Sequence, residues 1–488
     1  MRGLRATAVL LLAAATASAH VGNVGVFHEG PAGPYRLLVS VTPPSVIPGV
    51  AEVSIRTVGP EVSRLAITPL PLTGGGTALA PKADVALRSK DDPRFFTGTL
   101  WLMTAGSWQV RIEAEGAAGK GTLSIPVPAL PQKTKGMSTG LALLLSSLGL
   151  LLVLGFAAIA GAAAREATLP KGVSPDARAR RRGRAAVATG ALFAGGVVLL
   201  GSRWWDAEAG AYARYVYKPL KLEAKLSTPA SGEELRLTLE DPGWIKSRKK
   251  DDFLLDHGHP MHLFVVRLPE LDRVFHLHPE AARTGEFVVK MPPMPAGRYR
   301  LFGDVVHATG LSETAVADMT LPAIAGTPLS GDDSAGVAPP LAGTAASRNE
   351  SALKDGGRML FERDGSPLVA GRVALLRFRI VNRDGRDADD LEPYMGMLGH
   401  AAILDRNLTV FAHVHPTGSI PMAALAVANP GAPLPGHVMS AEGLPSEVSF
   451  PFAFPGAGDY RLFVQVKRAG VVETGVFDVR VEAEKARR

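Results

Sequence analysis

Hydrophobic and polar residues alternate along most of the chain, but two long stretches break this pattern. Residues 136–164 carry no charged side chain, and residues 185–202 form a second apolar run that Trp204 and Trp205 follow. Runs of this length can cross a bilayer as helices, and tryptophan is common at the membrane interface. We predict transmembrane helices at 137–163 and 185–204, joined by a loop at 164–184. The length and the Leu/Ala content of both runs disfavour the alternative of two buried core helices.

The alternating stretches predict β-strands that belong to three domains. The pattern A-G-x-aromatic, followed by alternating apolar residues, occurs at 104–112, 295–302 and 456–463. A turn glycine shortly before an aromatic residue that opens a strand is typical of the tyrosine-corner region of immunoglobulin-like sandwiches. We therefore predict a mainly β fold with three immunoglobulin-like β-sandwich domains, at 20–130, 218–322 and 358–484, plus a two-helix transmembrane hairpin.

The second and third domains form a duplicated pair, named here repeat A (218–322) and repeat B (358–484). Whole strands match between them: YRLFGDVV aligns with YRLFVQVK, and ETAVADMTL aligns with ETGVFDVRV. The stretch 323–357 between the repeats is rich in Pro, Gly and small polar residues, which predicts a flexible linker.

The positive charge of the chain is concentrated between the two apolar runs. The net charge is +7, and residues 165–184 carry +5 of it, as seven Lys/Arg against Glu166 and Asp176. The rest is nearly balanced, which argues against a nucleic-acid partner. Short basic loops stay on the cytoplasmic side of a membrane. Segments 20–135 and 203–488 are therefore predicted to lie outside, in the periplasm of an inner-membrane protein.

The N-terminus has the features of an export signal. Arg2 and Arg5 precede an apolar run that ends in Ala17-Ser18-Ala19, a small-residue cleavage site. Residues 1–19 are predicted to be a signal peptide, and cleavage after Ala19 would leave His20 as the first mature residue.

Histidine is the residue that suggests chemistry. Cysteine is absent, which excludes disulfides, zinc–thiolate sites and iron–sulfur clusters. All twelve histidines fall in the predicted exterior parts, and five of them lie within 257–278. Alignment of the repeats on His262 and His400 shows a duplicated set. Repeat A offers His257, His259, His262, His276 and His278, and repeat B offers Met395, Met397, His400, His413 and His415 at the equivalent positions.

The spacing of these residues predicts that they converge. Residues i and i+2 of a strand share a face, so His276 and His278 are co-facial, as are His413 and His415. A hairpin with its turn near 269–271 would bring His262 opposite the first pair. The upstream H-G-H and M-G-M segments could fold over each site as a flexible flap. This predicts one three-imidazole metal site in each repeat.

Ligand type narrows the metal. Imidazole suits Zn, Cu, Fe and Ni, whereas thioether selects Cu(I). Copper is the expected metal, with Cu(I) favoured in repeat B and Cu(II) or Zn in repeat A. The alternative is that the histidines are strand-end residues that hydrogen-bond nearby loops. Ordinary core packing explains Met261, Met291, Met294, Met422 and Met439, and the roles of His307 and His437 stay open.

A separate site could exist at the mature N-terminus. The α-amine and imidazole of His20 can chelate one ion together, and His28 could add a third nitrogen. This T-shaped arrangement is a histidine brace. The alternative is an arbitrary first residue and a loop histidine without a ligand.

Several motifs resemble those of known bacterial envelope proteins. Repeat B carries Gly399-His400, His413-Val414-His415-Pro416 and Tyr460-Arg461-Leu462-Phe463, and repeat A carries the parallel set. These resemble YtkA-like immunoglobulin-type domains, a resemblance that implies copper handling. The N-terminal domain is similar to exported copper-resistance domains of the CopC type, which begin with His, although the opening HVGNV differs from theirs.

Together these features predict a membrane-anchored periplasmic copper-binding protein, without enzyme activity, that buffers copper, delivers it or confers resistance. Its expected partners are the metal ion, the inner membrane and a copper transporter or chaperone. One alternative is an envelope scaffold with structural histidines. Another is a mononuclear copper oxidase that uses His20.

Overall fold

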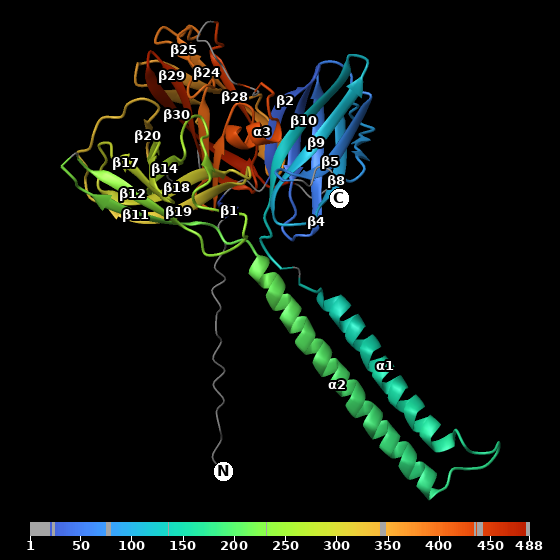
Figure 1. Cartoon of the computed structure of the whole chain (residues 1–488). Helices are drawn as coiled ribbons and strands as arrows, with labels where there is room; N and C mark the ends of the chain where they lie inside the picture. Colours follow the sequence, from blue (N-terminus) through green and yellow to red (C-terminus); the bar gives the residue numbers. More distant parts are fainter. Residues whose placement is uncertain are drawn as a thin grey trace, which may run out of the picture. The chain divides into compact units, whose positions relative to one another are not determined.

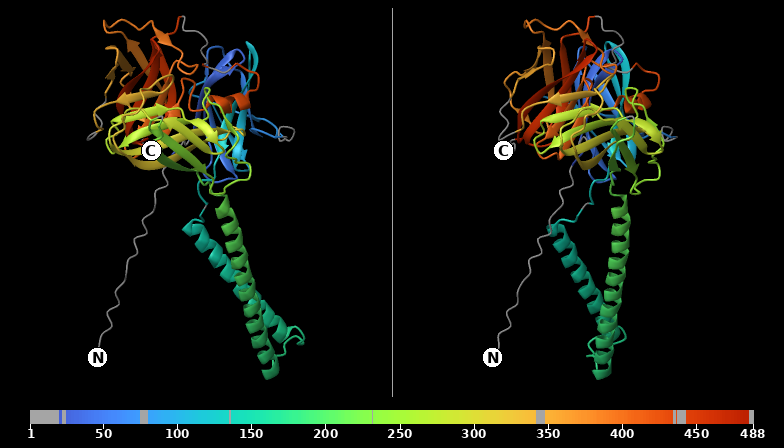
Figure 2. Two further views of the ribbon diagram at one scale, coloured as in Figure 1. Left: turned by 60° about the vertical axis from the view of Figure 1, so that its left-hand side comes forward. Right: turned by 90° about the vertical axis from the view of Figure 1, so that its left-hand side faces the viewer.

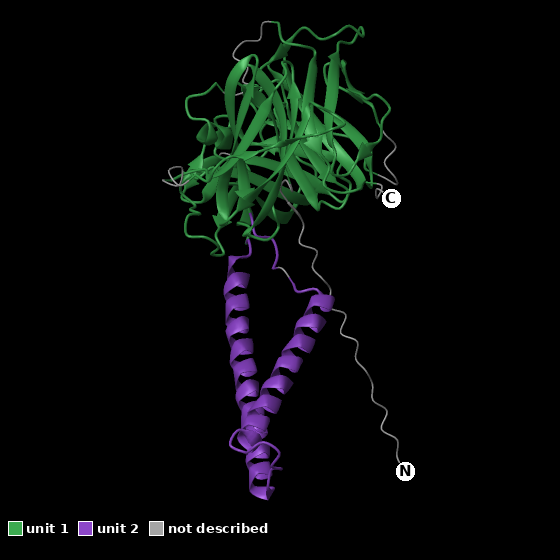
Figure 3. Ribbon diagram, turned by 90° about the vertical axis from the view of Figure 1, so that its right-hand side faces the viewer, with its two compact units in different colours: residues 1–129, 218–488 green, residues 130–217 purple. Residues whose placement is uncertain are grey.

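The computed structural model describes residues 20–21, 25–74, 80–134, 136–230, 232–341, 348–433, 436 and 443–484. The predicted signal peptide, 1–19, lies outside the described residues. The chain divides into two compact units, residues 1–129 with 218–488 and residues 130–217, which Figure 3 colours separately. The first unit is built from antiparallel sheets and the second from two long helices, so the predicted mainly β fold class is confirmed.

The N-terminal domain is a two-layer sandwich (blue in Figure 1). One sheet has the order β2 (Val26–Ala32), β3 (Tyr35–Thr42), β4 (Gly49–Val58), β8 (Phe95–Leu102) and β7 (Leu87–Arg88). The other has the order β10 (Gly119–Ala129), β9 (Gly106–Gly116), β5 (Arg64–Pro71) and β6 (Asp84–Val85). Alternate residues of β3 and β4 are buried between the layers, as the period-two pattern requires.

Repeat A is a sheet that folds over on itself, since its two layers are joined only where Lys221 of β11 pairs with Val316 of β19. The first layer contains β16 (Glu280–Arg283), β17 (Glu286–Lys290), β12 (Glu234–Glu240) and β11 (Lys221–Ser227). The second contains β19 (Ser312–Leu321), β18 (Gly297–His307), β14 (His262–Leu268), β15 (Arg273–Leu277) and β20 (Ser334–Val337), and β13 (Phe253–Leu254) pairs with β18.

Repeat B is a sandwich of two separate sheets and carries the short helix α3 (Met422–Ala428). The smaller sheet contains β21 (Glu350–Ala352), β22 (Arg358–Glu362), β24 (Val373–Val381) and β28 (Glu447–Ala453). The larger contains β1 (His20–Val21), β27 (Val410–Val414), β26 (His400–Asp405), β29 (Gly458–Arg468), β30 (Val471–Glu482) and β23 (Leu368–Val369), and β25 (Leu391–Glu392) pairs with β29.

The repeated A-G-x-aromatic motif forms the same corner in all three domains. The hydroxyl of Tyr299 donates to the Pro295 carbonyl at 2.7 Å, and that of Tyr460 donates to the Gly456 carbonyl at 2.9 Å. In the N-terminal domain the Trp108 indole N–H donates to the Thr104 carbonyl at 2.8 Å. Each aromatic side chain thus bonds to backbone a few residues upstream, which is the hydrogen bond that defines a tyrosine corner.

The two repeats pack against each other through the sheets that carry the histidine motifs (Figure 2). Their shared core stacks Phe302 of repeat A on Phe411 of repeat B, with ring centroids 4.2 Å apart. The members of this core come from both repeats and from the segment between them, and are Phe264, Val266, Leu271, Val274, Phe302, Leu341, Ala402, Leu404, Leu408, Phe411, Phe463 and Val476. The histidine motifs therefore lie at a domain interface.

The segment between the repeats was predicted to be a flexible linker over 323–357, and this is wrong for part of it. Residues 334–337 form β20, which pairs with β15 at the edge of repeat A. Residues 350–352 form β21, which pairs with β22 of repeat B. The composition of these two parts of the segment is typical of a loop, but their backbone groups form hydrogen bonds with the neighbouring sheets.

The second unit consists of α1 (Thr139–Glu166) and α2 (Ala177–Tyr215), both long and apolar enough to cross a membrane. The predicted basic loop, 164–184, is shorter than expected, because α2 begins at Ala177 and includes the arginine cluster. The Asp176 carboxylate accepts the Ala179 backbone N–H at 2.6 Å and caps this helix start. The helices approach closely at Gly161, where a Cβ would lie 2.4 Å from the Val187 side chain.

Candidate metal centre

Two equivalent hairpins position the histidine pairs. In repeat A, β14 and β15 pair with Phe264 opposite His276, which places His262 beside His278, with ring centroids 5.0 Å apart. In repeat B, β26 and β27 pair with Ala402 opposite His413, and the rings of His400 and His415 are likewise 5.0 Å apart. The alternation of strand side chains therefore produces the arrangement of three imidazoles that the spacing predicted.

The structure differs from the prediction in how the two sets are related. We predicted one site in each repeat, but the two sets form a single cluster across the repeat interface. The ring of His413 lies 5.1 Å from that of His262 and 5.6 Å from that of His276, and His257 lies 4.8 Å from His400. We call this cluster the imidazole centre. Its members are His257, His259, His262, His276, His278, His400, His413 and His415.

Two groups of three within this centre could hold an ion. His262, His276 and His278 form the repeat A group, and His257, His400 and His415 form the mixed group. In each group one nitrogen from every ring lies within 4.8 Å of the others. The mixed group takes two ligands from repeat B and one from repeat A, so it exists only when the repeats are docked.

Hydrogen bonds to fixed acceptors set the tautomers of the repeat A group. His262 Nε2 donates to the Asp256 carbonyl at 3.1 Å, and His276 Nδ1 donates to the Gln465 amide oxygen at 2.9 Å. His278 Nδ1 donates to the Asp333 carboxylate at 2.9 Å. Because a neutral imidazole carries one proton, the second nitrogen of each ring presents a lone pair. These lone pairs belong to His262 Nδ1, His276 Nε2 and His278 Nε2.

The mixed group is anchored in the same way. His257 Nδ1 donates to the Met395 carbonyl at 2.7 Å, and His415 Nδ1 donates to the Ile420 carbonyl at 3.1 Å. Both rings therefore turn an unprotonated Nε2 toward the centre. The side chain of His400 is fully buried, and neither of its ring nitrogens has a hydrogen-bond partner among the described residues. Buried polar atoms are rarely left unbonded, because losing hydration without replacement costs about 1–3 kcal/mol.

His413 lies between the two groups. Its Nδ1 is 3.5 Å from the Asp304 carboxylate, and its Nε2 is buried and has no hydrogen-bond partner in the part of the chain that the structure describes. Asp304 pairs with His262 in repeat A just as Gln465 pairs with His400 in repeat B. Each repeat therefore supplies an oxygen acceptor to the first histidine of the other repeat's H-x-H motif. Acceptors of this kind orient metal-ligating imidazoles.

The sequence did not single out these acceptor residues. Asp332 and Asp333 lie in the segment predicted to be a linker, and Asp304 and Gln465 sit in strands that matched only as part of the duplication. The buried Tyr394 hydroxyl donates to the Asp332 carbonyl at 2.8 Å and lies 3.3 Å from His276 Nδ1. The alignment of Asp304 with Gln465 was the one available signal, because each follows the corner tyrosine of its strand by the same interval.

The predicted flexible flap is instead a tight turn in both repeats. His257 and Gly258 have φ of 53° and 88°, and Met395 and Gly396 have φ of 52° and 76°. These are the angles of a type I′ turn, closed here by paired backbone bonds between Asp256 and His259 and between Tyr394 and Met397. The turn fixes where the flanking side chains point.

The two methionines proposed as Cu(I) ligands lie in hydrophobic clusters. Met397 is completely buried in the core of the N-terminal sandwich, together with Ile420 and Met422. Met395 packs with Tyr394 and Val472, and its carbonyl oxygen accepts a hydrogen bond from His257 Nδ1. The thioether argument for Cu(I) in repeat B therefore has no support in the packing.

Burial favours the neutral form of five imidazoles in the centre. Loss of hydration lowers the pKa of His262, His276, His400 and His415 well below the ordinary value, and the neighbouring imidazoles add to the effect. Burial also lowers the pKa of His278, against the opposing pull of the Asp333 carboxylate. Neutral imidazole is the form that binds metals.

The side chain of His20, the first ligand of the predicted N-terminal brace, lies outside the described residues. Its backbone pairs with Val410 in β1–β27. His28 is buried in β2, and its backbone bridges to Gly418 in the turn that follows His415. Burial lowers the pKa of His28 to about 4 despite the opposing effect of the Thr417 backbone.

Two further histidines stand apart. His307 is buried 3.1 Å from the Asp252 carboxylate and 2.9 Å from that of Glu313, which also pairs with Arg248. It belongs to an ion network inside repeat A and not to the imidazole centre. His437 lies outside the described residues.

The turn after His415 is held by the N-terminal sandwich. Glu29 donates its backbone N–H to the Thr417 carbonyl at 2.7 Å, and Ser419 donates to the Phe27 carbonyl at 2.9 Å. Gly418 has φ of 130°, and a Cβ there would lie 1.9 Å from the Phe27 carbonyl oxygen. Only glycine allows this approach of two backbones.

Replacing Gly418 with Ala should therefore separate β2 from the His415 turn and destabilise the unit by about 2 kcal/mol. Gly371→Ala is the matched control, because Gly371 also has positive φ but nothing lies within 4 Å of its added Cβ. Urea unfolding of both variants measures the difference. Equal losses of stability would contradict the proposed contact.

Comparison with known proteins gives a limited match. Residues 353–483, most of repeat B, match a domain of unknown function, DUF8832. No curated protein matches the chain.

Solved structures give only remote likeness. A bacterial ice-binding adhesin is 8% identical with a TM-score of 0.15, covering 92% of this chain and 99% of its own. MtrC from Shewanella baltica is 12% identical with a TM-score of 0.15, covering 65% of this chain and 72% of its own. Salmonella alpha-2-macroglobulin is 10% identical with a TM-score of 0.19, covering 94% of this chain and 23% of its own. Scores this low carry no functional argument.

Proposed function

We propose that this chain is a membrane-anchored copper-binding protein that holds copper in the imidazole centre, for buffering, delivery or resistance. Its two apolar helices would cross the inner membrane, and the β-sandwich unit would face the periplasm. In this proposal the protein binds metal and does not catalyse a reaction. In this proposal a copper transporter or chaperone exchanges copper with the imidazole centre.

One observation carries the proposal. His262 Nδ1 and His276 Nε2 lie 3.1 Å apart in a buried site. The single N–H of each ring already donates to the Asp256 carbonyl or to the Gln465 amide oxygen, so the two remaining nitrogens face each other with lone pairs. Metal–nitrogen bonds of about 2.0–2.1 Å place two ligand nitrogens roughly 3 Å apart when they share one ion. A cation between the rings would convert this repulsion into two bonds.

The ligand chemistry favours copper among the metals that imidazole binds. A site made of neutral nitrogen ligands suits Zn, Cu, Fe or Ni, and Cu(II) binds such ligands most tightly of the divalent series. The three carboxylates that surround the centre, Asp304, Asp332 and Asp333, offset part of the charge of a bound cation. The preference for Cu(I) in repeat B is not part of the proposal, because it rested on methionine sulfur.

The test is the copper content of the full chain in detergent, after removal of metal and dialysis against Cu(II) or Zn(II). Two groups of three imidazoles predict about two copper ions per chain. His278→Ala and His415→Ala, at equivalent positions in the repeats, should each remove about one ion. His307→Gln, a buried histidine outside the centre, should remove none.

Bound copper should also stabilise the fold, by about 4 kcal/mol when free copper is a thousand times the dissociation constant. A chain that binds no copper and does not change its melting temperature would contradict the proposal in favour of a scaffold with structural histidines. Binding of stoichiometric zinc without any copper would support a metal site in the imidazole centre but would contradict copper as its metal.

A further inference from the structure

The two sides of the imidazole centre differ in their access to solvent. On the repeat B side, the His415 turn is covered by β2, and Met397 is buried in the core of the N-terminal sandwich. At the equivalent positions of repeat A are His278 and His259. There the base of the turn formed by residues 256–259 is buried at Asp256, which accepts the Ala423 backbone N–H at 2.7 Å, but Gly258 at its tip is exposed.

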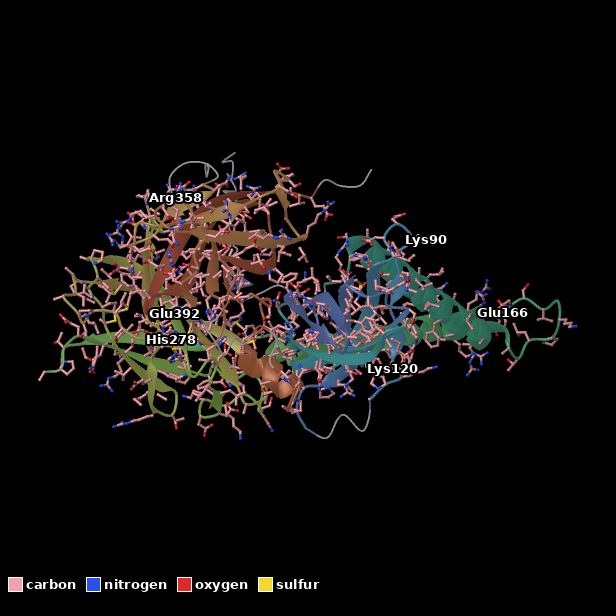
Figure 4. The ribbon with its side chains drawn as sticks, turned by 90° about the horizontal axis from the view of Figure 1, so that it is seen from above. Lys90, Lys120, Glu166, His278, Arg358 and Glu392 are labelled. Carbon is pink, nitrogen blue, oxygen red and sulfur yellow. The ribbon has the colours of Figure 1, made fainter. Side chains whose placement is uncertain are left out.

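His259 connects this surface to the buried ligands. Its side chain is 27% exposed, whereas that of His278 is 4% exposed. The two rings stack with centroids 4.0 Å apart, so His259 lies directly over a member of the repeat A group. His278, which is labelled in Figure 4, is the more deeply buried of these two residues.

An acidic side chain completes the surface pair. Asp332, 30% exposed, places a carboxylate oxygen 3.4 Å from His259 Nε2. Lys467 lies 3.5 Å from the other oxygen of the same carboxylate, and the Tyr394 hydroxyl holds the Asp332 backbone carbonyl. The carboxylate is therefore held at the rim by neighbours from repeat B, while the imidazole comes from repeat A.

We propose that His259 and Asp332 form an outer capture site for a transition-metal ion, from which the ion passes to His278 and the rest of the repeat A group. This proposal rests on the proposed function, because it assigns the route into the same centre. One imidazole and one carboxylate, with water in the remaining positions, bind weakly and exchange quickly. The stacked His278 ring then offers the next nitrogen.

The asymmetry of the repeats gives this route a direction. In repeat B the residue equivalent to His259 is Met397, whose side chain is sealed in a hydrophobic core. The mixed group has no comparable pair among the described residues, so its ion would arrive through the repeat A group, with His413 between the two. Loading is then sequential: the repeat A group fills first.

The experiment follows Cu(II) uptake by the metal-free full chain in detergent, using stopped-flow absorbance, with the final copper content measured separately. His259→Ala and Asp332→Asn should each slow uptake by about tenfold, a typical effect of removing a focusing charge or ligand from a site mouth. The final copper content should stay at the wild-type value. The Asp332→Asn effect should shrink at high ionic strength, because salt screens the carboxylate. His278→Ala serves as the comparison, since it should lower the final copper content.

Wild-type uptake rates in both variants would overturn the capture site while leaving the copper-binding proposal intact. Loss of one bound ion in His259→Ala would also overturn it, because His259 would then be a resident ligand. A wild-type chain without any copper would instead contradict the proposed function itself.

Discussion

Acidification from pH 7 to about pH 5 should destabilise the metal-free protein by several kcal/mol. The imidazoles of His262, His276, His400 and His415 have pKa values far below normal in the folded state, mainly through burial. In the unfolded chain they would titrate near pH 6.5. Stability from these groups is therefore present above pH 6.5 and is lost as the pH falls, because the unfolded state takes up protons that the folded state cannot.

The expected size follows from the number of groups. Each histidine contributes up to about 1.4 kcal/mol per pH unit below its unfolded pKa, so four together contribute about 5 kcal/mol per unit. This rivals the whole stability of many domains, which is about 5–15 kcal/mol. Urea unfolding at pH 8, 7, 6 and 5 measures the slope, and His262→Gln with His400→Gln should reduce it by about 3 kcal/mol per pH unit, the share of two groups.

His307 acts in the opposite sense and serves as an internal check. Burial opposes its charge, but Glu313 and Asp252 together raise its pKa above the ordinary value. Its stabilising contribution is complete below pH 6.5 and is lost as the pH rises through the raised pKa. Replacing His307 with Gln should therefore steepen the loss of stability on acidification. If the free energy of unfolding of the unmodified chain did not change between pH 7 and pH 5, this would contradict buried, neutral imidazoles in the centre.

Arg461→Ala should destabilise the protein by about 3–5 kcal/mol, the usual cost of leaving one partner of a buried ion pair unpaired. The Arg461 side chain is 1% exposed and forms two bonds to the Asp478 carboxylate, at 2.7 and 2.8 Å. Its Nη1 also donates to the Leu271 carbonyl of repeat A at 2.7 Å and to the Pro339 carbonyl at 2.9 Å. The substitution removes bonds within repeat B and between the repeats together.

The duplication supplies a matched control. Arg300 occupies the equivalent strand position in repeat A and pairs with Asp318, but its side chain is 25% exposed and, among the described residues, donates no hydrogen bond to repeat B. A partly exposed pair of this kind contributes about 1 kcal/mol or less. Chemical denaturation of Arg300→Ala and Arg461→Ala should separate the two values. Equal losses would show that Arg461 does not anchor the repeats.

The copper content of Arg461→Ala extends this test to the centre. The mixed group draws His257 from repeat A and its other two ligands from repeat B. Weaker docking should therefore reduce binding at the mixed group more than at the repeat A group, whose three ligands belong to one hairpin.

Local pattern predicted the strands and the corners well. The H-x-H pairs lie on one face because strand side chains alternate, and the A-G-x-aromatic motif forms the same corner three times. These features depend on neighbours close in sequence, and a single sequence contains that information.

The arrangement of the imidazole centre could not be predicted in this way. His257 contacts His400 because two sandwiches dock through Phe302 and Phe411, and such docking depends on complementary surfaces that no local motif records. Met397 looked like a ligand because it replaces His259, yet the N-terminal sandwich covers that position and favours an apolar side chain. Asp332 and Asp333 could not be predicted as part of the centre, because a Gly-rich, polar segment resembles a linker even when its backbone joins a sheet.

The hydrogen bonds that join β2 to the His415 turn have a consequence for assembly. Phe27 and Ser419 are 392 residues apart, so nearly the entire polypeptide must be made before they can meet. Contacts between such remote partners form late, because a long loop must close first. The contact between β2 and the His415 turn, which covers one side of the imidazole centre, is therefore expected to form last. A C-terminal fragment that lacks the N-terminal sandwich would expose that side to water.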